Sequence, residues 1–517
     1  MQLFLCGPGC YDNPGPFVVS KAYKFQYFGY NEGERLLLLG ARLLRKNEGG
    51  FVMDQLFKLK EHGTTVRTEI MAGLTTFMTM AYILAVNPNI LSAFGSGATG
   101  MSWYPVFLAT AIAAGVVTIC MGLFVNFPVA LAPGMGLNAY FATVILASSG
   151  KFTYQMGLAA VFISGIIFLI LTVTKIRQLL IVAVPDSMKH AITVGIGLFI
   201  TIIGLKNSGL MTVAVEAGQD IKAHAFTDVL SFETVIHMGS LKDPNVILAV
   251  VGLILISAFM VLRVRGAILF GILLTTIVGM LMGLVDFSTL SKPQSPWVPD
   301  FSQLAIAHFD FKGLMNVGIL TVIATFTFVE LFDTFGTLVG TANRAGYMKN
   351  KEAGTKRVGK AMLVDAIGVS GGALVGTSTV TAFVESSAGI AEGGRTGLTS
   401  VTTGICFLLA LFLAPIAALI PGSATAAALI VVGLLMMQSV REIDFQDFVV
   451  AIPSFFTIVF MPFTYNIANG VSFGIVTYVI LATVANATGK GKYKVHWLMW
   501  ILAVLIVLRY VFIGSEG

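Results

Sequence analysis

The sequence predicts an all-α protein with many membrane spans. Of its 517 residues, 56% are hydrophobic and only 11% are charged, whereas soluble domains average about 25% charged residues. Apolar stretches of about 20 residues, the length of an α-helix that crosses the hydrocarbon core, recur from Ile70 onward. The net charge of +6 does not indicate nucleic-acid binding, because the basic residues gather at the span ends, where they set the topology.

The first 52 residues differ from the rest of the chain. They begin with a segment rich in Gly and Pro and continue with the apolar patch LLLLGARLL, which is too short to cross a membrane. We expect residues 1–52 to be a disordered extension, or the product of a start codon upstream of the natural one at Met53. The four cysteines form no metal-binding motif, so we expect neither a metal nor a cofactor.

Seven spans are predicted in the first half, residues 53–285. Lys58, Lys60 and Arg67 precede the first span, which places the N-terminus in the cytoplasm by the positive-inside rule. The long acidic loop at 208–245 then lies outside the cell. The predicted spans are 70–92, 104–124, 129–148, 153–174, 187–207, 246–263 and 266–285.

A second set of seven spans is predicted in residues 286–496. Basic residues follow its first and last members and again lie in the cytoplasm by this count. The segment 497–514, within the C-terminal part 497–517, is left over and is either a fifteenth span or a sign that a weaker span does not cross fully. The predicted spans are 314–341, 359–375, 378–394, 398–419, 423–439, 447–464 and 469–487.

Seven spans per half would give two halves of opposite orientation, the inverted repeat common in secondary transporters. The third segment of each half is interrupted by small residues: ALAPGMGLNAYFA at 130–142 and GTSTVTAFVESSAG at 376–389. Such backbone is tolerated at membrane depth only where protein or a polar cavity covers it. Matched interruptions of this kind indicate a binding site between the repeats.

The first half offers this site only neutral groups. Between Glu69 and Lys151 there is no Asp, Glu, Lys or Arg, and Asn138 is the notable polar residue. An amide has donors and acceptors and can pair with the edge of a heterocycle. The alternative, which the residues by themselves favour, is an asparagine that caps or bridges helices.

The second half supplies the carboxylates. Glu330 and Asp333 share a helix face, and Asp333 shares one with Thr337. Asp365 and Glu385 follow, and no Lys or Arg accompanies these groups at mid-span depth. Buried carboxylates without a basic partner can carry a proton, so proton coupling through Glu385, Asp333 or Glu330 is the hypothesis. The alternative is that they line a watery vestibule.

With these residues in view, the chain resembles a nucleobase/cation symporter of the AzgA-like purine permease branch. The resemblance runs from Met53 to the C-terminus. It is carried by TTFMTMAYILAVNP (75–88), the interrupted segments at 132–142 and 376–389, FDTFGTLVGTA (332–342) and MPFTYNIANG (461–470).

The resemblance implies the seven-plus-seven fold of uracil permeases, with a core domain, a gate domain and short extended strands in the third and tenth segments. It also implies that Asn138, Asp333 and Glu385 bind the substrate. Uracil permeases carry a histidine where this chain has Thr337, so a histidine proton relay is not expected. Thr337 is a further substrate-binding candidate.

The extended segment adds more candidates for the site. Ser378 and Thr379 are substrate-binding candidates there, and Phe383 and Tyr140 could stack on the base. We expect no catalytic residue, because no nucleophile and base stand together in any motif.

The expected function is import of adenine, guanine or hypoxanthine across the cell (inner or plasma) membrane by proton symport with alternating access. The expected partners are the purine, a proton and the lipid bilayer, with a homodimer as an option. The alternatives are an anion carrier on the related sulfate-permease fold, a channel or a membrane-embedded enzyme. The buried acidic residues argue against an anion site.

Overall fold

The described part of the chain is mostly helical. The computed structural model describes residues 49–148, 150–174, 183–213, 236–285, 287, 296–316, 319–349, 351–489, 491 and 493–512. Within it, ten helical segments are long and apolar enough to cross a membrane, and four shorter apolar helices accompany them. The chain is therefore a multi-pass membrane protein.

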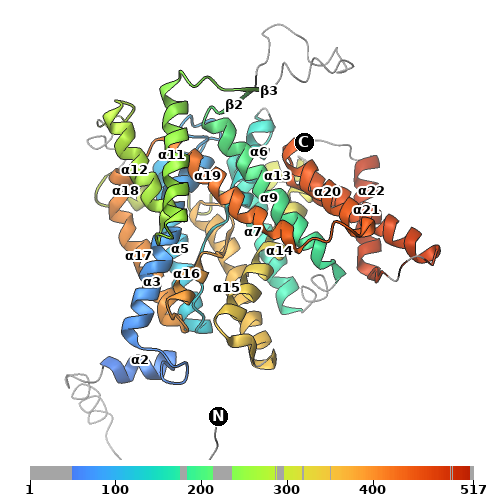
Figure 1. Ribbon diagram of the computed structural model, residues 1–517, viewed down its shortest axis with the longest axis horizontal. Helices are drawn as coiled ribbons and strands as arrows, with labels where there is room; N and C mark the ends of the chain where they lie inside the picture. Colours follow the sequence, from blue (N-terminus) through green and yellow to red (C-terminus); the bar gives the residue numbers. More distant parts are fainter. Residues whose placement is uncertain are drawn as a thin grey trace, which may run out of the picture. The chain divides into compact units, whose positions relative to one another are not determined.

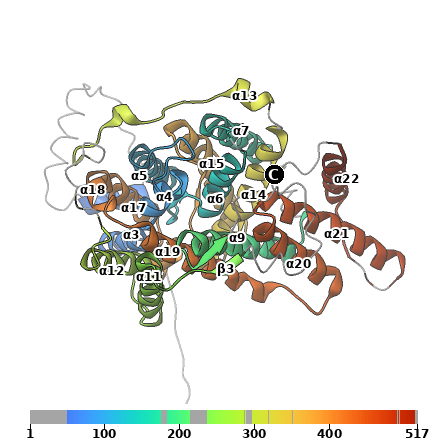
Figure 2. The same ribbon diagram turned by 90° about the horizontal axis from the view of Figure 1, so that it is seen from above.

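The helices contact one another in two groups (Figures 1 and 2). In the first group α17 packs on α3 and α5, α15 packs on α5 and α7, and α4 packs on α5 and α6. The members of the first group are α3 (Val66–Met80), α4 (Ile83–Leu91), α5 (Trp103–Cys120), α6 (Met135–Ala147), α7 (Tyr154–Val173), α14 (Ile319–Arg344), α15 (Lys351–Val375), α16 (Ser386–Ala391) and α17 (Gly397–Leu409).

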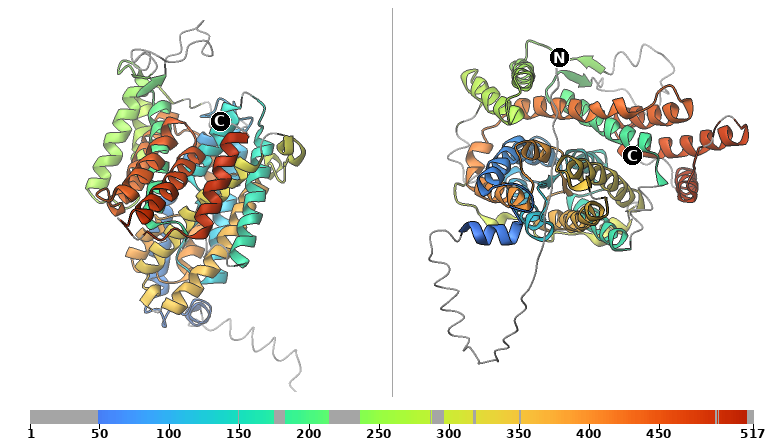
Figure 3. Two further views of the ribbon diagram at one scale, coloured as in Figure 1. Left: turned by 90° about the vertical axis from the view of Figure 1, so that its right-hand side faces the viewer. Right: turned by 60° about the horizontal axis from the view of Figure 1, so that its bottom comes forward.

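The second group forms a layer beside the first (Figure 3, right). In it α9 packs on α19, α20 and α21, and α11 packs on α12 and α19. Fewer pairs join the two groups, among them α6 with α9 and α3 with α12. The members of the second group are α9 (Asp186–Asn207), α11 (Pro244–Val261), α12 (Ala267–Leu281), α19 (Gly422–Met437), α20 (Phe448–Phe463), α21 (Ile467–Ala487) and α22 (Trp497–Phe512).

Glycines let helices approach closely in both helix groups. A Cβ atom on Gly404 of α17 would lie 2.6 Å from the carbonyl oxygen of Gly115 on α5. A Cβ on Gly433 of α19 would lie 2.4 Å from the carbonyl oxygen of Gly197 on α9. Small residues at such crossings are typical of membrane helix packing, where close van der Waals contact replaces the hydrophobic effect.

Several spans begin at side-chain caps that the sequence supplies. Thr153 accepts a hydrogen bond from the Met156 backbone N–H at the start of α7. Asn466 accepts from Ala468 N–H at the start of α21 in the same way. These side chains satisfy backbone donors that have no partner inside the helix.

Most of the predicted spans agree with helices to within a few residues. The predicted spans 129–148 and 378–394 are not continuous helices, because each consists of a short strand followed by a helix, of 13 residues in the first and six in the second. The span predicted at 359–375 is part of a longer helix, because α15 already begins at Lys351. The basic residues before 359 continue this helix beyond its apolar part, because Lys, Glu and Arg are good helix formers. The remaining segment at 497–514 forms a helix, α22, of 16 residues.

A buried carboxylate joins α3 to α17. Glu69, in the first turn of α3, is fully buried. Its oxygens accept from the backbone N–H of Arg395 at 2.8 Å and of Thr396 at 3.2 Å, and from the Thr399 hydroxyl at 2.5 Å. The carboxylate thus lies at the N-terminus of α17, where the helix dipole favours negative charge.

Short elements complete the described chain. The strands β2 (Met211–Val213) and β3 (Ile236–Met238) pair antiparallel in the long loop after α9. Most of the acidic loop predicted at 208–245, and residues 1–48, lie outside the described residues. The remaining helices are α2 (Gly49–Phe57), α13 (Phe311–Asn316) and α18 (Ala414–Ala417).

Candidate substrate site

The two interrupted segments meet as a pair of short strands. β1 (Leu131–Pro133) pairs antiparallel with β4 (Val380–Ala382), with Ala132 opposite Thr381. The pairing continues beyond the strands, because Gly134 N–H donates to the Thr379 carbonyl at 3.0 Å and Phe383 N–H donates to the Ala130 carbonyl at 3.0 Å. Both strands are fully buried. Extended backbone in the third and tenth segments is therefore present where the resemblance implied it.

Side chains of the first helix group satisfy the outer edges of this strand pair. The Thr118 hydroxyl lies 2.9 Å from both the N–H and the carbonyl oxygen of Leu131. Asp365, fully buried on α15, accepts from Ala382 N–H at 3.2 Å. Since unpaired backbone groups are costly in the membrane, these contacts explain how non-helical backbone is tolerated here. Asp365 therefore supports β4.

Asn138 lies one turn into α6, which begins directly after β1, and is fully buried. Its Nδ2 donates to Asn87 Oδ1 at 2.6 Å, and its Oδ1 accepts from the Ser378 hydroxyl. Asn138 thus bridges α4 and the segment before β4. It has amide capacity left for a ligand, because an asparagine side chain can make four hydrogen bonds.

Glu385 lies at the other end of the strand pair, just before α16, and is half-buried. Its Oε1 accepts from the Tyr82 hydroxyl at 2.8 Å. Tyr82 is fully buried at the junction between α3 and α4, where the first span is broken. A hydrogen bond to one carboxylate oxygen fixes the side chain and leaves the other oxygen for a further donor.

Helix α14 carries two of the predicted carboxylates, Glu330 and Asp333. Glu330 is fully buried and accepts from the Thr334 hydroxyl at 3.2 Å; that hydroxyl also lies 2.9 Å from the Thr381 hydroxyl of β4. Asp333 belongs to α14, but its side chain lies outside the described residues. Thr337 is half-buried one turn further along.

The hydroxyls before β4 complete the cluster. Thr377, Ser378 and Thr379 are fully buried. Thr377 accepts from Asn87 Nδ2 at 3.0 Å, and Ser378 donates to Asn138. The Thr379 hydroxyl has no hydrogen-bond partner among the described residues. A buried hydroxyl without a partner is uncommon in native proteins, so Thr379 has a donor and an acceptor to offer a ligand.

Two residues of the cluster were not predicted as site residues, Tyr82 and Asn87. Both fall inside the motif TTFMTMAYILAVNP, which is otherwise apolar after Thr79. The signal that could have found Asn87 is an amide directly before Pro88 inside a span, since proline within a helix often accompanies a functional break. Nothing in the sequence marks Tyr82 as the partner of Glu385.

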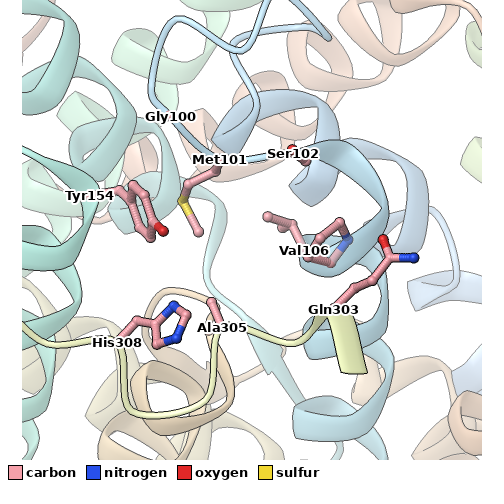
Figure 4. Close-up of a pocket in the computed structure, with 10 residues that line it drawn as sticks. Gly100, Met101, Ser102, Val106, Tyr154, Gln303, Ala305 and His308 are labelled. Carbon is pink, nitrogen blue, oxygen red and sulfur yellow. The ribbon is translucent and has the colours of Figure 1, made fainter. Parts of the chain in front are cut away.

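Two cavities lie near the cluster but do not include the predicted residues. One, of about 140 Å³, is lined by Gly100, Tyr154, His308 and Gly376, among others (Figure 4). The second, of about 260 Å³, lies between the helix groups and is lined by residues of α4, α6 and α9 and by Tyr465. Among the described residues no three His, Cys, Asp or Glu side chains come close enough to hold a metal ion.

The chain is similar to known permeases over nearly its whole length. The Permease family model (Xan_ur_permease) matches residues 67–473. Adenine permease AdeP of Escherichia coli is 39% identical over 472 residues, which are 91% of this chain and 98% of that protein. Guanine/hypoxanthine permease PbuO of Bacillus subtilis is 40% identical over 457 residues, which are 88% of this chain and 99% of that protein.

A solved structure has a similar fold. The transmembrane domain of the cyanobacterial bicarbonate transporter BicA superposes with a TM-score of 0.53 at 16% identity, covering 81% of this chain and 97% of that one. At this identity the likeness concerns the fold alone. The sequence relatives are permeases, not enzymes. The chain therefore belongs to the nucleobase permease family, in the branch that contains these adenine and guanine/hypoxanthine permeases.

Proposed function

We propose that this chain imports purine nucleobases across the cell membrane by proton symport with alternating access. The observation that carries the proposal is the polar cluster buried where β1 meets β4, since a buried amide, a carboxylate and free hydroxyl capacity match the edges of a purine. The relatives named as adenine and guanine/hypoxanthine permeases support the same substrate class.

In this proposal the base lies against the ends of the two strands. Glu385 and Asp333 accept from N–H groups of the base, and Asn138 pairs with an edge that offers both a donor and an acceptor. Ser378, Thr379 and Thr337 contribute hydroxyls. The unpartnered Thr379 hydroxyl supports this placement most directly, because it is buried beside the strand pair.

The proton would be carried by one of the carboxylates. Glu385, Asp333 and Glu330 are the candidates, and no Lys or Arg among the described residues forms an ion pair with Glu385. A carboxylate in such surroundings can exchange a proton as its solvation changes between outward and inward states. Tyr82 would then hold Glu385 in place in either form.

The division into two helix groups suggests which parts of the protein move during transport. We assign the first group as the core and the second as the gate of a seven-plus-seven inverted repeat, with residues 53–285 and 286–496 as the repeats. In the described part of the chain, the polar contacts between the groups include a hydrogen bond from Asn89 of α4 to Thr425 of α19 at 3.0 Å and an ion pair of Arg265 with Glu392 at 2.8 Å. Polar contacts of this kind can break and form as the groups shift. The N-terminus lies in the cytoplasm in this assignment.

An anion carrier is the second candidate, because the fold resembles that of a bicarbonate transporter. The described cluster argues against it. An anion needs donors and positive charge, whereas Glu385 and Glu330 add negative charge beside the strands.

The test is uptake of labelled hypoxanthine, adenine, guanine and uracil in cells without their own nucleobase carriers, with and without a protonophore. Saturable purine uptake that collapses with the protonophore is expected. Glu385→Gln should abolish it, because the amide can neither carry the proton nor accept at both atoms. Glu442→Gln, which changes an exposed carboxylate away from the strand pair, is the matched control and should retain uptake. Full uptake by a well-expressed Glu385→Gln protein would refute the assignment, and uptake of bicarbonate but no base would refute the substrate class.

A further inference from the structure

We propose that Asn87 and Thr110 fix the direction of the Asn138 amide, and that this direction makes the carrier discriminate between 6-amino and 6-oxo purines. The inference rests on the proposed function, since it concerns the base that Asn138 would contact. Asn87 lies on α4, Thr110 on α5 and Asn138 on α6, and all three are fully buried.

The orientation of the Asn87 amide depends first on the Val106 backbone carbonyl, which can only accept a hydrogen bond. The Thr110 hydroxyl donates to the Val106 carbonyl at 2.6 Å. A hydroxyl has a single proton, so Thr110 can offer only lone pairs to its other neighbour, the side chain of Asn87, 2.7 Å away. The Asn87 atom that faces Thr110 must therefore be the amide nitrogen.

The second N–H of the same nitrogen supports this direction. Asn87 Nδ2 also donates to the Thr377 hydroxyl at 3.0 Å. With its nitrogen committed to two hydroxyls, Asn87 turns its oxygen toward Asn138. Turning the Asn87 amide over would place an acceptor against the Thr110 oxygen, whose proton is already used, and a donor against Asn138.

The orientation of the Asn87 amide determines that of the Asn138 amide. Its Nδ2 lies 2.6 Å from Asn87 Oδ1, and its Oδ1 accepts from Ser378 on the far side. One N–H and one oxygen lone pair of Asn138 have no partner among the described residues. The chain of three hydrogen bonds that links Val106, Thr110, Asn87 and Asn138 thus fixes where that donor and that acceptor lie.

The two purine classes present opposite patterns to such an amide. A 6-oxo purine has an acceptor oxygen next to the N1–H donor, whereas a 6-amino purine has a donor amino group next to the N1 acceptor. An amide free to turn over can pair with either edge. A fixed amide pairs with one and places like groups against the other, and each buried group left unpaired weakens binding. Because Glu385 would hold another edge, the base cannot turn over to compensate.

The experiment compares the half-saturating concentrations for labelled adenine and hypoxanthine in cells that lack other nucleobase carriers. For the wild type the two should differ by about tenfold or more. Thr110→Val keeps the side-chain volume but removes the hydroxyl, so Asn87 and Asn138 can turn over together. The ratio of the two half-saturating concentrations should then fall to within about threefold of unity. Thr110→Ser keeps the hydroxyl and should restore the wild-type ratio.

Thr275→Val is the matched control. Thr275 of α12 is also fully buried, and its hydroxyl donates to the Gly271 carbonyl at 2.7 Å, the same one-turn contact without an amide beyond it. Its ratio should stay at the wild-type value. Asn87→Leu is the second variant, in case Thr110→Val does not reach the membrane, and it should also lower the ratio, because it releases Asn138.

Three results would separate the possible failures. Purine uptake by the wild type with a ratio near unity would overturn the inference and leave the proposed function standing. So would an unchanged ratio in whichever of Thr110→Val and Asn87→Leu is present in the membrane at wild-type amounts. Absence of uptake of any purine by the wild type would overturn the proposed function, and the inference with it.

Discussion

Removing the Glu69 carboxylate should destabilise the protein by an amount that its three contacts allow us to estimate. The carboxylate accepts from two backbone N–H groups and from the Thr399 hydroxyl. A hydrogen bond to a charged group contributes about 1.5–3 kcal/mol, and each donor left unpaired costs about 1–3 kcal/mol. Because such contributions overlap, we expect Glu69→Ala to lower the free energy of unfolding by about 3–5 kcal/mol.

This loss should be visible in a thermal scan of detergent-purified protein. At about 2.1 cal/mol/K per residue, unfolding the roughly 420 described residues has an entropy of about 0.9 kcal/mol/K, so 3–5 kcal/mol corresponds to a drop of about 3–6 °C in Tm. Glu69→Gln retains one acceptor and should lose about half as much. The readout is the Tm of each variant by fluorescence-detected size exclusion.

The control is Glu392→Gln, which removes a carboxylate from a partly exposed ion pair with Arg265. Such pairs contribute about 0–1 kcal/mol, so its Tm should stay within about 1 °C of the wild type. If Glu69→Ala unfolds at the wild-type temperature, the carboxylate does not stabilise the start of α17, and the argument from its hydrogen bonds is wrong.

Two further predictions concern packing and pH. A Cβ atom on Gly389 of α16 would lie 2.1 Å from Thr76 Oγ1 and 2.5 Å from the Ala72 carbonyl oxygen of α3. Gly389→Ala should therefore lower stability by about 1–3 kcal/mol, whereas Gly359→Ala, with no atom within 4 Å of the new Cβ, should be neutral or slightly stabilising by Tm. Burial, with Arg357 acting in the same direction, lowers the pKa of His62, which precedes the first span. The unfolded chain then binds the proton more readily, so Tm should fall as pH drops below about 6.5, and His62→Phe should reduce that fall; an equal fall in both proteins would contradict it.

Most spans and both interruptions could be predicted because each leaves a local signal, whereas the extended strands were implied by the family resemblance and their pairing was not predicted. Apolar length marks a span, and clustered Gly, Ser and Thr mark the interruptions at 130–142 and 376–389. Asn138 and Glu385 stand out for the same reason, as polar residues beside those interruptions. The structure places both at the ends of the strand pair.

The partners of these residues could not be predicted, because they come from segments far apart in the sequence. Tyr82 is 303 positions from Glu385, and Asn87 is 51 positions from Asn138. A tyrosine or a threonine within an apolar span looks the same in sequence whether its hydroxyl bonds its own helix or a distant side chain. Thr110 does both, and only the packing of α4 against α5 and α6 reveals it.

The pairing of β1 with β4 also has a consequence for biosynthesis. The partner of Leu131 is Ala382, which leaves the ribosome about 250 residues later. At about 5–20 residues per second, the first strand is made roughly 10–50 s before the strand that will pair with it. During that time its N–H and C=O groups cannot stay unpaired in lipid. The first half of this protein therefore cannot complete its fold until the second half has been synthesised. Until then, water or an insertion factor must bind the N–H and C=O groups of β1.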